Sequence, residues 1–204
     1  MVHRRHGSCG PDAALDAALA CVHRAIELDP ELAEAHAVAG FIRFWNGDHE
    51  ASTRAFERAE SLAPENARNL ERHAFCLAMS GQTAYATEYV RRAQVCNPHE
   101  PHYFPRAMFA FVSGDFAQAV SLLRASVDRL PAFLPSSIFL AAALELVGDS
   151  TGAAEAVAGL RKANAGESFP NTLRHWLPAM SHPGMRPLHE GFARAWSLWE
   201  SGSR

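Results

Sequence analysis

Small and bulky apolar residues recur along the chain at fixed phases, and glycine and proline separate the segments that carry them. One series consists of glycines at intervals of 34, 33 and 34 residues: Gly47, Gly81, Gly114 and Gly148. A second series has an alanine five residues before a proline, at steps of 34: Ala25 and Pro30, Ala59 and Pro64, Ala93 and Pro98. A constant period near 34 residues is typical of stacked helix–turn–helix units. The pattern therefore predicts an all-α chain.

The same glycines and prolines divide the chain into predicted helices. Asp12 can cap the first helix, because its carboxylate can accept from free N–H groups of the first turn. Proline ends a helix because it cannot continue the hydrogen-bond ladder. We expect a polar, flexible tail over residues 1–11. We expect helices over residues 13–28, 31–46, 49–62, 65–80, 83–96, 101–112, 116–130, 136–147, 151–163, 168–180 and 185–200.

Several positions carry the same kind of residue in each unit. Small residues stand in the first helix at Gly40, Ala74, Ala107 and Ala141, and in the second at Ala86, Ala119 and Ala153. Large apolar residues stand in the second helix at Phe56, Val90, Leu123 and Val157. Helices packed about 8–10 Å apart need small residues at closest approach and bulky ones beside them.

On these positions, residues 12–165 resemble the tetratricopeptide repeat. Ser52 departs from its usual alanine, and Arg106 departs from its usual leucine. The resemblance implies a right-handed α-solenoid of about four helix–turn–helix units. We expect residues 166–204, which follow the repeats, to form a C-terminal helical cap.

In tetratricopeptide repeats the first helix of each unit lines the concave face. The resemblance places these residues in the groove as the expected partner-binding site: Glu34, Phe41, Phe44, Trp45, Arg68, Glu71, Phe75, Met79, Phe104, Met108 and Phe111. The fourth unit adds Pro135, Ile138, Ala142, Glu145 and Leu146. This apolar face, with Arg68 as its cation, fits an apolar or amphipathic segment of a partner protein. The alternative is that half of these residues are core between units, or that the last helix covers them.

The last predicted helix carries an apolar stripe at helical spacing: Leu188, Phe192, Ala195, Trp196 and Trp199. Such a stripe needs a cover. One interpretation is a capping helix that seals the last unit. The others are that it folds back into the groove, or that it docks on a second copy through Phe192, Trp196 and Trp199.

Composition argues against several classes of protein. The net charge of −3 and the isoelectric point near 6.4 give no basic face for nucleic acid. No apolar run approaches the length of a membrane span, and the N-terminus lacks the pattern of a signal peptide. The cysteines, Cys9, Cys21, Cys76 and Cys96, have no close-pair spacing. We therefore expect reduced thiols in a cytoplasmic protein.

Two sets of residues have spacings that could collect a transition metal: His3, His6 and Cys9, and Cys96, His99 and His102. Neither shows a fourth ligand, so we expect no metal and no cofactor. The other histidines are scattered, and we expect them at the surface or partly packed: His23, His36, His49, His73, His175, His182 and His189. The chain lacks a GxSxG elbow and a phosphate loop, and helical repeats rarely form a convergent catalytic pocket. We therefore expect no enzymatic activity.

A narrower resemblance concerns three runs: RAIELDPELAEAHAVAG, GDFAQAVSLLRASVDRLP and MRPLHEGFARAW. They are similar to the repeat region that follows the catalytic domain in some bacterial class III adenylate cyclases. This resemblance implies the C-terminal regulatory region of a signalling protein without its catalytic domain. Three hypotheses therefore stay open: a protein-binding scaffold, such a regulatory region, and a structural or oligomerisation module.

Overall fold

A computed structural model of the chain describes residues 11–163 and 186–201. The regular structure within these ranges is helical: α1 (Pro11–Leu28), α2 (Ala33–Trp45), α3 (His49–Leu62), α4 (Ala67–Met79), α5 (Thr83–Cys96), α6 (Tyr103–Val112), α7 (Phe116–Arg129), α8 (Leu134–Val147), α9 (Ser150–Ala163) and α11 (Arg186–Ser201). Consecutive helices pack as pairs, α2 with α3, α4 with α5, α6 with α7 and α8 with α9. The all-α prediction is confirmed.

Predicted and observed helix ends agree within two residues throughout the described ranges. The prediction that Asp12 caps the first helix is wrong, because α1 already begins at Pro11 and Asp12 lies inside its first turn. Proline suits that position, since its missing N–H would have no partner there. The tail expected before Pro11 and the helix expected over residues 168–180 lie outside the described residues.

The same turn closes the first helix of every pair. Its glycine has a φ between 74° and 83° at all four positions, a left-handed conformation that suits glycine: Gly47, Gly81, Gly114 and Gly148. The residue after the glycine donates its N–H to a carbonyl five residues back, as Asp48 does to Arg43 at 3.0 Å. The recurring glycines in the sequence therefore mark one helix end per unit.

The residue after this glycine also starts the second helix in three of the four pairs. Asp48 accepts from the N–H of Ala51 at 3.1 Å, which satisfies one of the free donors of the first turn. Asp115 and Asp149 make equivalent bonds at 3.0 and 2.9 Å. Gln82 holds this position before α5 and makes no side-chain cap.

The predicted small positions lie where paired helices approach most closely. A Cβ on Gly40 would stand 2.9 Å from Cδ2 of Phe56 and 3.1 Å from the carbonyl of Ser52. The corresponding alanines are at most 2% exposed: Ala74, Ala86, Ala107, Ala119, Ala141 and Ala153. Ser52, which replaces the usual alanine, donates its hydroxyl to the Gly40 carbonyl at 2.7 Å. The repeat phases derived from the sequence are therefore confirmed.

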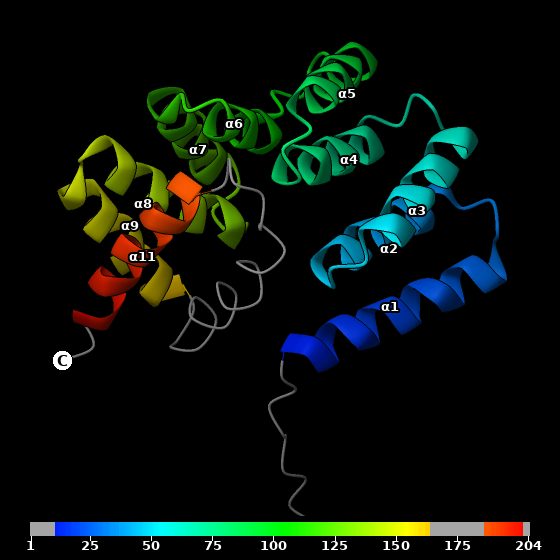
Figure 1. Cartoon of the computed structure of the whole chain (residues 1–204), viewed down its shortest axis with the longest axis horizontal. Coiled ribbons are helices and arrows are strands. Elements are labelled where there is room, and N and C mark those ends of the chain that lie inside the picture. The colour runs from blue at the N-terminus through cyan, green and yellow to red at the C-terminus, as the bar shows by residue number, and fades with distance from the viewer. Residues whose placement is uncertain (1–10, 164–185, 202–204) are drawn as a thin grey trace, which may run out of the picture.

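The pairs follow one another along an arc that begins with α1 and ends with α11 (Figure 1). Their first helices stack, with α2 against α4 and α4 against α6, and α4 lies on the inner side of the arc with α5 outside it (Figure 1). The packing changes at the fourth pair, where α8 lies more extensively against α7 than against α6. The chain is an α-solenoid, as predicted.

Helix α11 covers the end of this array. Its buried face consists of Leu188, Phe192, Ala195 and Trp199, which are at most 7% exposed. The rings of Phe192 and Phe139 pack edge to face, with their centroids 5.2 Å apart. A Cβ on Gly191 would stand 2.6 Å from the carbonyl of Ala142 in α8. These contacts support the capping interpretation.

The position of α11 leaves little of its aromatic stripe for docking on a second copy. Phe192 and Trp199 are already buried within the chain, and Trp196 is half-buried, so they offer little surface to another molecule. The same packing covers Ala142, one of the concave positions expected in the fourth unit.

Candidate functional site: the inner face of the array

Six of the eleven residues expected in the concave groove belong to the core instead. They are between 0% and 7% exposed: Phe44, Trp45, Phe75, Met79, Met108 and Phe111. The ring of Phe111, for example, lies 6.2 Å from that of Phe139 in the next pair. The expectation is corrected for these six, because the contacts between successive pairs need bulky apolar side chains and draw them from the first helices.

Arg68 and Glu34 remain at the surface of the inner helices. The Arg68 side chain is 73% exposed and the Glu34 side chain 49%. Glu34 lies 3.8 Å from Arg68 and 3.4 Å from Arg72, which links α2 to α4 across two units. Exposed ion pairs of this kind contribute at most about 1 kcal/mol. Arg68 can therefore exchange Glu34 for an acidic group of a partner at little cost.

Four aromatic rings, which we call the aromatic strip, run from α2 across α4 and α6 to the residue before α8: Phe41, Phe75, Phe104 and Phe133. Successive ring centroids lie 5.7, 5.8 and 5.1 Å apart. Phe75 is buried, Phe41 and Phe104 are half-buried, and Phe133 is 36% exposed. Sequence reasoning missed Phe133, which stands in the turn between two helices. The strip gives the surface an apolar component on the same helices, α2 and α4, that carry Glu34 and Arg68.

Glu71, also expected in the groove, instead makes a hydrogen bond within the chain. Its carboxylate bonds to Nδ1 of His102, whose Nε2 donates to the carbonyl of Asn97 at 3.0 Å. His102 is 3% exposed and has a φ of 51°, in the left-handed region that is uncommon for a residue with a side chain. The pair ties α4 to the turn before α6.

Cys96, His99 and His102, whose spacing could collect a metal, do not come together in the structure. Cys96 and His99 are exposed, whereas the ring of His102 is buried against Glu71. Within the described residues, no group of three histidine, cysteine or acidic side chains could hold a metal ion. The other set, His3, His6 and Cys9, lies outside the described residues.

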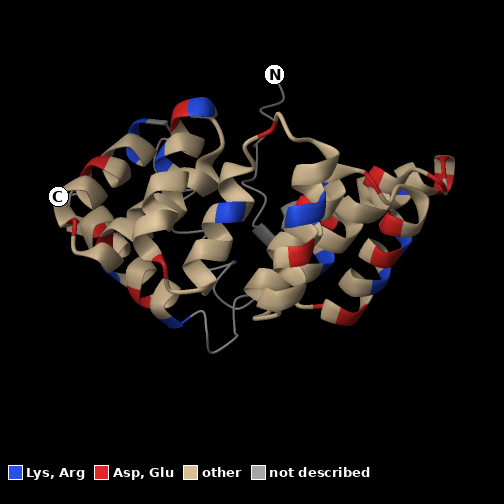
Figure 2. Cartoon of the chain, turned by 90° about the horizontal axis from the view of Figure 1, so that it is seen from above, with Lys and Arg blue, Asp and Glu red and all other residues tan. Residues whose placement is uncertain are grey.

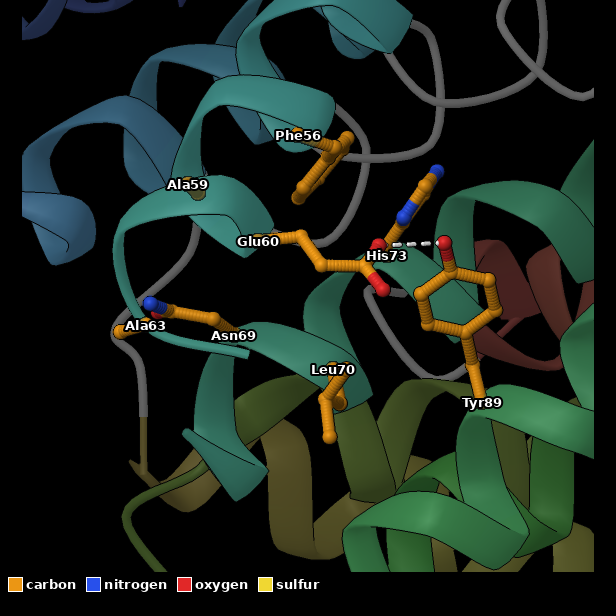
Figure 3. Close-up of a pocket in the computed structure, with 8 residues that line it drawn as sticks. All are labelled: Phe56, Ala59, Glu60, Ala63, Asn69, Leu70, His73 and Tyr89. Atoms are coloured by element: carbon orange, nitrogen blue, oxygen red, sulfur yellow. Dashed lines mark hydrogen bonds between the residues drawn. The ribbon is translucent and has the colours of Figure 1, made fainter. Parts of the chain in front are cut away.

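A small hollow lies between α3, α4 and α5 (Figure 3). It is lined by Phe56, Ala59, Glu60, Ala63, Asn69, Leu70, His73 and Tyr89. Its free volume is about 10 Å³, close to what a single water molecule needs. The hollow is therefore too small for an organic ligand, and its interest lies in the charged groups that surround it.

Glu60 is the acceptor at the centre of this cluster. The Tyr89 hydroxyl donates to its Oε2 and Arg92 donates to its Oε1, each at 2.6 Å. Burial raises the pKa of Glu60, but the hydrogen bonds from Tyr89 and Arg92 outweigh it and hold that pKa below its usual value. Burial and the bond to Glu60 raise the pKa of Tyr89 to about 12. At neutral pH, Glu60 is therefore ionised and Tyr89 keeps its proton.

His73 is buried beside this cluster and is 8% exposed. Its ring stacks on Phe56 with the centroids 4.5 Å apart and the planes 6° from parallel, and Tyr89 meets it at 4.5 Å. Burial lowers the pKa of His73 to about 4. The expectation that this histidine lies at the surface or is partly packed is thus corrected. One signal could have revealed it: His73 occupies the same phase of its unit as the buried Leu140.

Charges of both signs are distributed over the array. Figure 2 shows Lys and Arg mixed with Asp and Glu in the view from above, instead of gathered on one basic or acidic face. None of the helices in the described ranges is both long and apolar enough to cross a bilayer.

Comparison with known proteins supports the fold. No family model matches the chain, and no curated protein matches it. Among solved structures, the chain is similar to PilW, described as a widely conserved type IV pilus biogenesis factor. The TM-score is 0.62 at 20% sequence identity, and the match covers 92% of this chain and 84% of the PilW chain. At this level of identity the similarity shows a shared helical-repeat fold.

Proposed function

We propose that the protein is a scaffold that binds a partner protein on the inner face formed by the first helices of its first three pairs, α2, α4 and α6. The observation that carries this proposal is that α2 and α4 stack directly and join an exposed ion pair, Arg68 with Glu34, to a half-buried ring, Phe41 against Phe75. Helical-repeat proteins use such extended inner surfaces for binding. PilW shares the fold and is described as a pilus biogenesis factor, which favours an assembly role over catalysis.

The chemistry of this surface favours an amphipathic segment as the ligand. Its apolar side chains would contact the aromatic strip at Phe41 and Phe104, and an acidic side chain would pair with Arg68. Residues at helical spacing in such a segment present both groups on one side. Of the eleven residues expected from sequence, Glu34, Phe41, Arg68 and Phe104 keep this role in the proposal.

The regulatory-region hypothesis and the cytoplasmic location stay predictions from sequence. The three runs that resemble adenylate cyclase repeat regions have no support from the comparison with curated proteins. The scaffold proposal does not depend on either of them, because a repeat array can bind a partner inside a longer chain.

A peptide-display selection against the full chain tests the proposed surface. We expect selected peptides to combine apolar residues at helical spacing with Asp or Glu. Arg68→Glu should weaken their binding at least tenfold, because it replaces attraction by repulsion at the acidic position. Tyr85→Glu on the outer helix α5 is the matched control, since Tyr85 is 66% exposed. Equal binding by wild type and both variants would refute the inner-face site.

A further inference from the structure

The cluster around His73 joins the second helix of one pair to both helices of the next. Glu60 of α3 is bonded to Tyr89 and Arg92 of α5, and Phe56 of α3 stacks on His73 of α4. Figure 3 shows the Glu60 side chain reaching from α3 to the Tyr89 hydroxyl, with His73 beside them. Arg92 adds a bond to the carbonyl of Pro64 at 3.2 Å. We call this cluster the α3–α5 joint.

In the described part of the chain, the joint accommodates a neutral His73 but provides no hydrogen-bond acceptor for a charged one. Within the described residues, neither ring nitrogen of His73 has a hydrogen-bond partner, and the ring lies between two aromatic side chains. The charged or titratable groups that face it are Glu60 from α3 and Tyr89 and Arg92 from α5. Both oxygens of Glu60 already accept a hydrogen bond, and Arg92 balances its charge.

We propose that protonation of His73 opens the α3–α5 joint, so that acid loosens the array between its first and second helix pairs. An imidazolium held between two aromatic rings, in a side chain that is 8% exposed, loses most of its hydration, which is unfavourable. Arg92 repels this charge and Glu60 attracts it, so the loss of hydration is the main penalty. The helices can relieve it by separating, which admits more water to the ring. Because α2 and α4 stack across the same boundary, this opening also changes the spacing of the inner face.

The direction of the pH dependence follows from where the proton binds. The pKa of His73 is about 4 in the folded chain against an ordinary value of 6.5. Between these values the open or unfolded chain binds more protons than the closed one. The closed joint therefore has its full stability above pH 6.5 and loses it as the pH falls toward 4. The pKa of Glu60 is also held below its usual value in the folded chain, so protonation of Glu60 in acid acts in the same direction.

The first test compares unfolding of the full chain at pH 7 and pH 4.5 in wild type and His73→Leu. Leucine is the choice because Leu140 occupies the same phase in the fourth unit. We expect the wild-type unfolding constant to rise on the order of 50-fold more than that of the variant over this interval. His99→Gln, at an exposed histidine, should keep the wild-type response. Equal pH responses of wild type and His73→Leu would overturn the proposal.

A second measurement decides the question in wild type alone if the leucine variant fails to fold. The Cε1–H resonance of His73 is followed by NMR from pH 7.5 to pH 4, together with amide resonances of α3 and α5. We expect the ring to stay neutral until below pH 5 and its titration to coincide with shifts of amides on both sides of the joint. Titration of the ring near pH 6.5, or titration without amide shifts, would overturn the proposal.

Discussion

At Gly40 the missing side chain is what allows α2 and α3 to pack closely. The nearest atoms to a Cβ there belong to Phe56 and to the backbone of Ser52, and the backbone cannot move aside without shifting α3. Gly159, in the middle of α9, presents the opposite case, since a Cβ there would meet nothing within 4 Å. Packing therefore requires glycine at position 40, whereas position 159 has room for a larger residue.

Gly40→Ala and Gly159→Ala should change stability in opposite directions. The first introduces a methyl into a filled contact, and overpacking of this kind costs about 1–3 kcal/mol. The larger change Gly40→Leu should cost at least as much. The second replaces an exposed helical glycine and should stabilise the fold by about 0.5–1 kcal/mol. Urea unfolding of the three variants measures both effects; stabilisation by Gly40→Ala would show that the repeat phase is misplaced.

Tyr89→Phe tests the hydrogen bond to Glu60 without removing the ring that lies against His73. A hydrogen bond to a charged group contributes about 1.5–3 kcal/mol, and the partial exposure of this pair favours the lower end. Tyr85→Phe is the matched control on the same helix, because Tyr85 is exposed. Thermal unfolding at pH 7 should show a lower melting temperature for Tyr89→Phe and an unchanged one for Tyr85→Phe. Equal melting temperatures for the two variants would mean that the bond adds nothing.

Sequence reasoning succeeds at Gly40 and fails at His73 for one physical reason. A small residue at a fixed phase recurs in every unit, so its role is visible in the pattern. The burial of His73 depends on Phe56 and Tyr89, which come from two other helices. The other units carry different residues at the positions equivalent to these two. The prediction that six further residues line the groove was wrong for a similar reason, because their exposure depends on how closely successive pairs pack.

At the scale of elements, two neighbouring residues mark the turn between the two helices of each pair. A left-handed glycine ends the first helix of a pair, and the next residue begins the second. These signals are local, which explains why the helices could be predicted to within two residues. The position of the fourth pair could not be predicted, because the shift of α8 toward α7 arises from packing between elements distant from the turn signals.

Gln82→Asp should stabilise the array by supplying the cap that α5 lacks. The three other turns carry Asp at this position, and each aspartate accepts from an N–H of the following helix. A side-chain cap typically contributes about 1 kcal/mol. The matched variant Asp115→Ala should lose a similar amount. Chemical denaturation measures both changes; destabilisation by Gln82→Asp would indicate that the second turn differs from the others.

At the scale of the whole molecule, α11 completes a fold in which each pair otherwise leaves an apolar side open to the next. Helix α8 is buried along most of its length, between α7, α9 and α11. Sequence reasoning could identify the stripe on α11 but could not decide among its possible covers. The approach of Gly191 to the backbone of α8 shows that this chain provides the cover itself.

Phe192→Ala should therefore destabilise the whole array and not α11 alone. Its ring is 1% exposed and fills the contact with Phe139, and removing a buried phenylalanine ring costs about 3–5 kcal/mol. Ser197→Ala changes an exposed position of the same helix and should have little effect. Unfolding followed by circular dichroism distinguishes the two. A wild-type transition for Phe192→Ala would show that α11 does not seal the array.

Site-specific photo-cross-linking tests the central claim, that the inner face over α2 and α4 binds a partner protein. An aromatic photoreactive amino acid replaces Phe41 on the inner face in one variant and Tyr85 on the outer face in another, and both are irradiated in the cells that make the protein. The account predicts a discrete adduct with one partner at position 41 and none at position 85. An adduct at position 85 alone, or identical adducts at both positions, would contradict it.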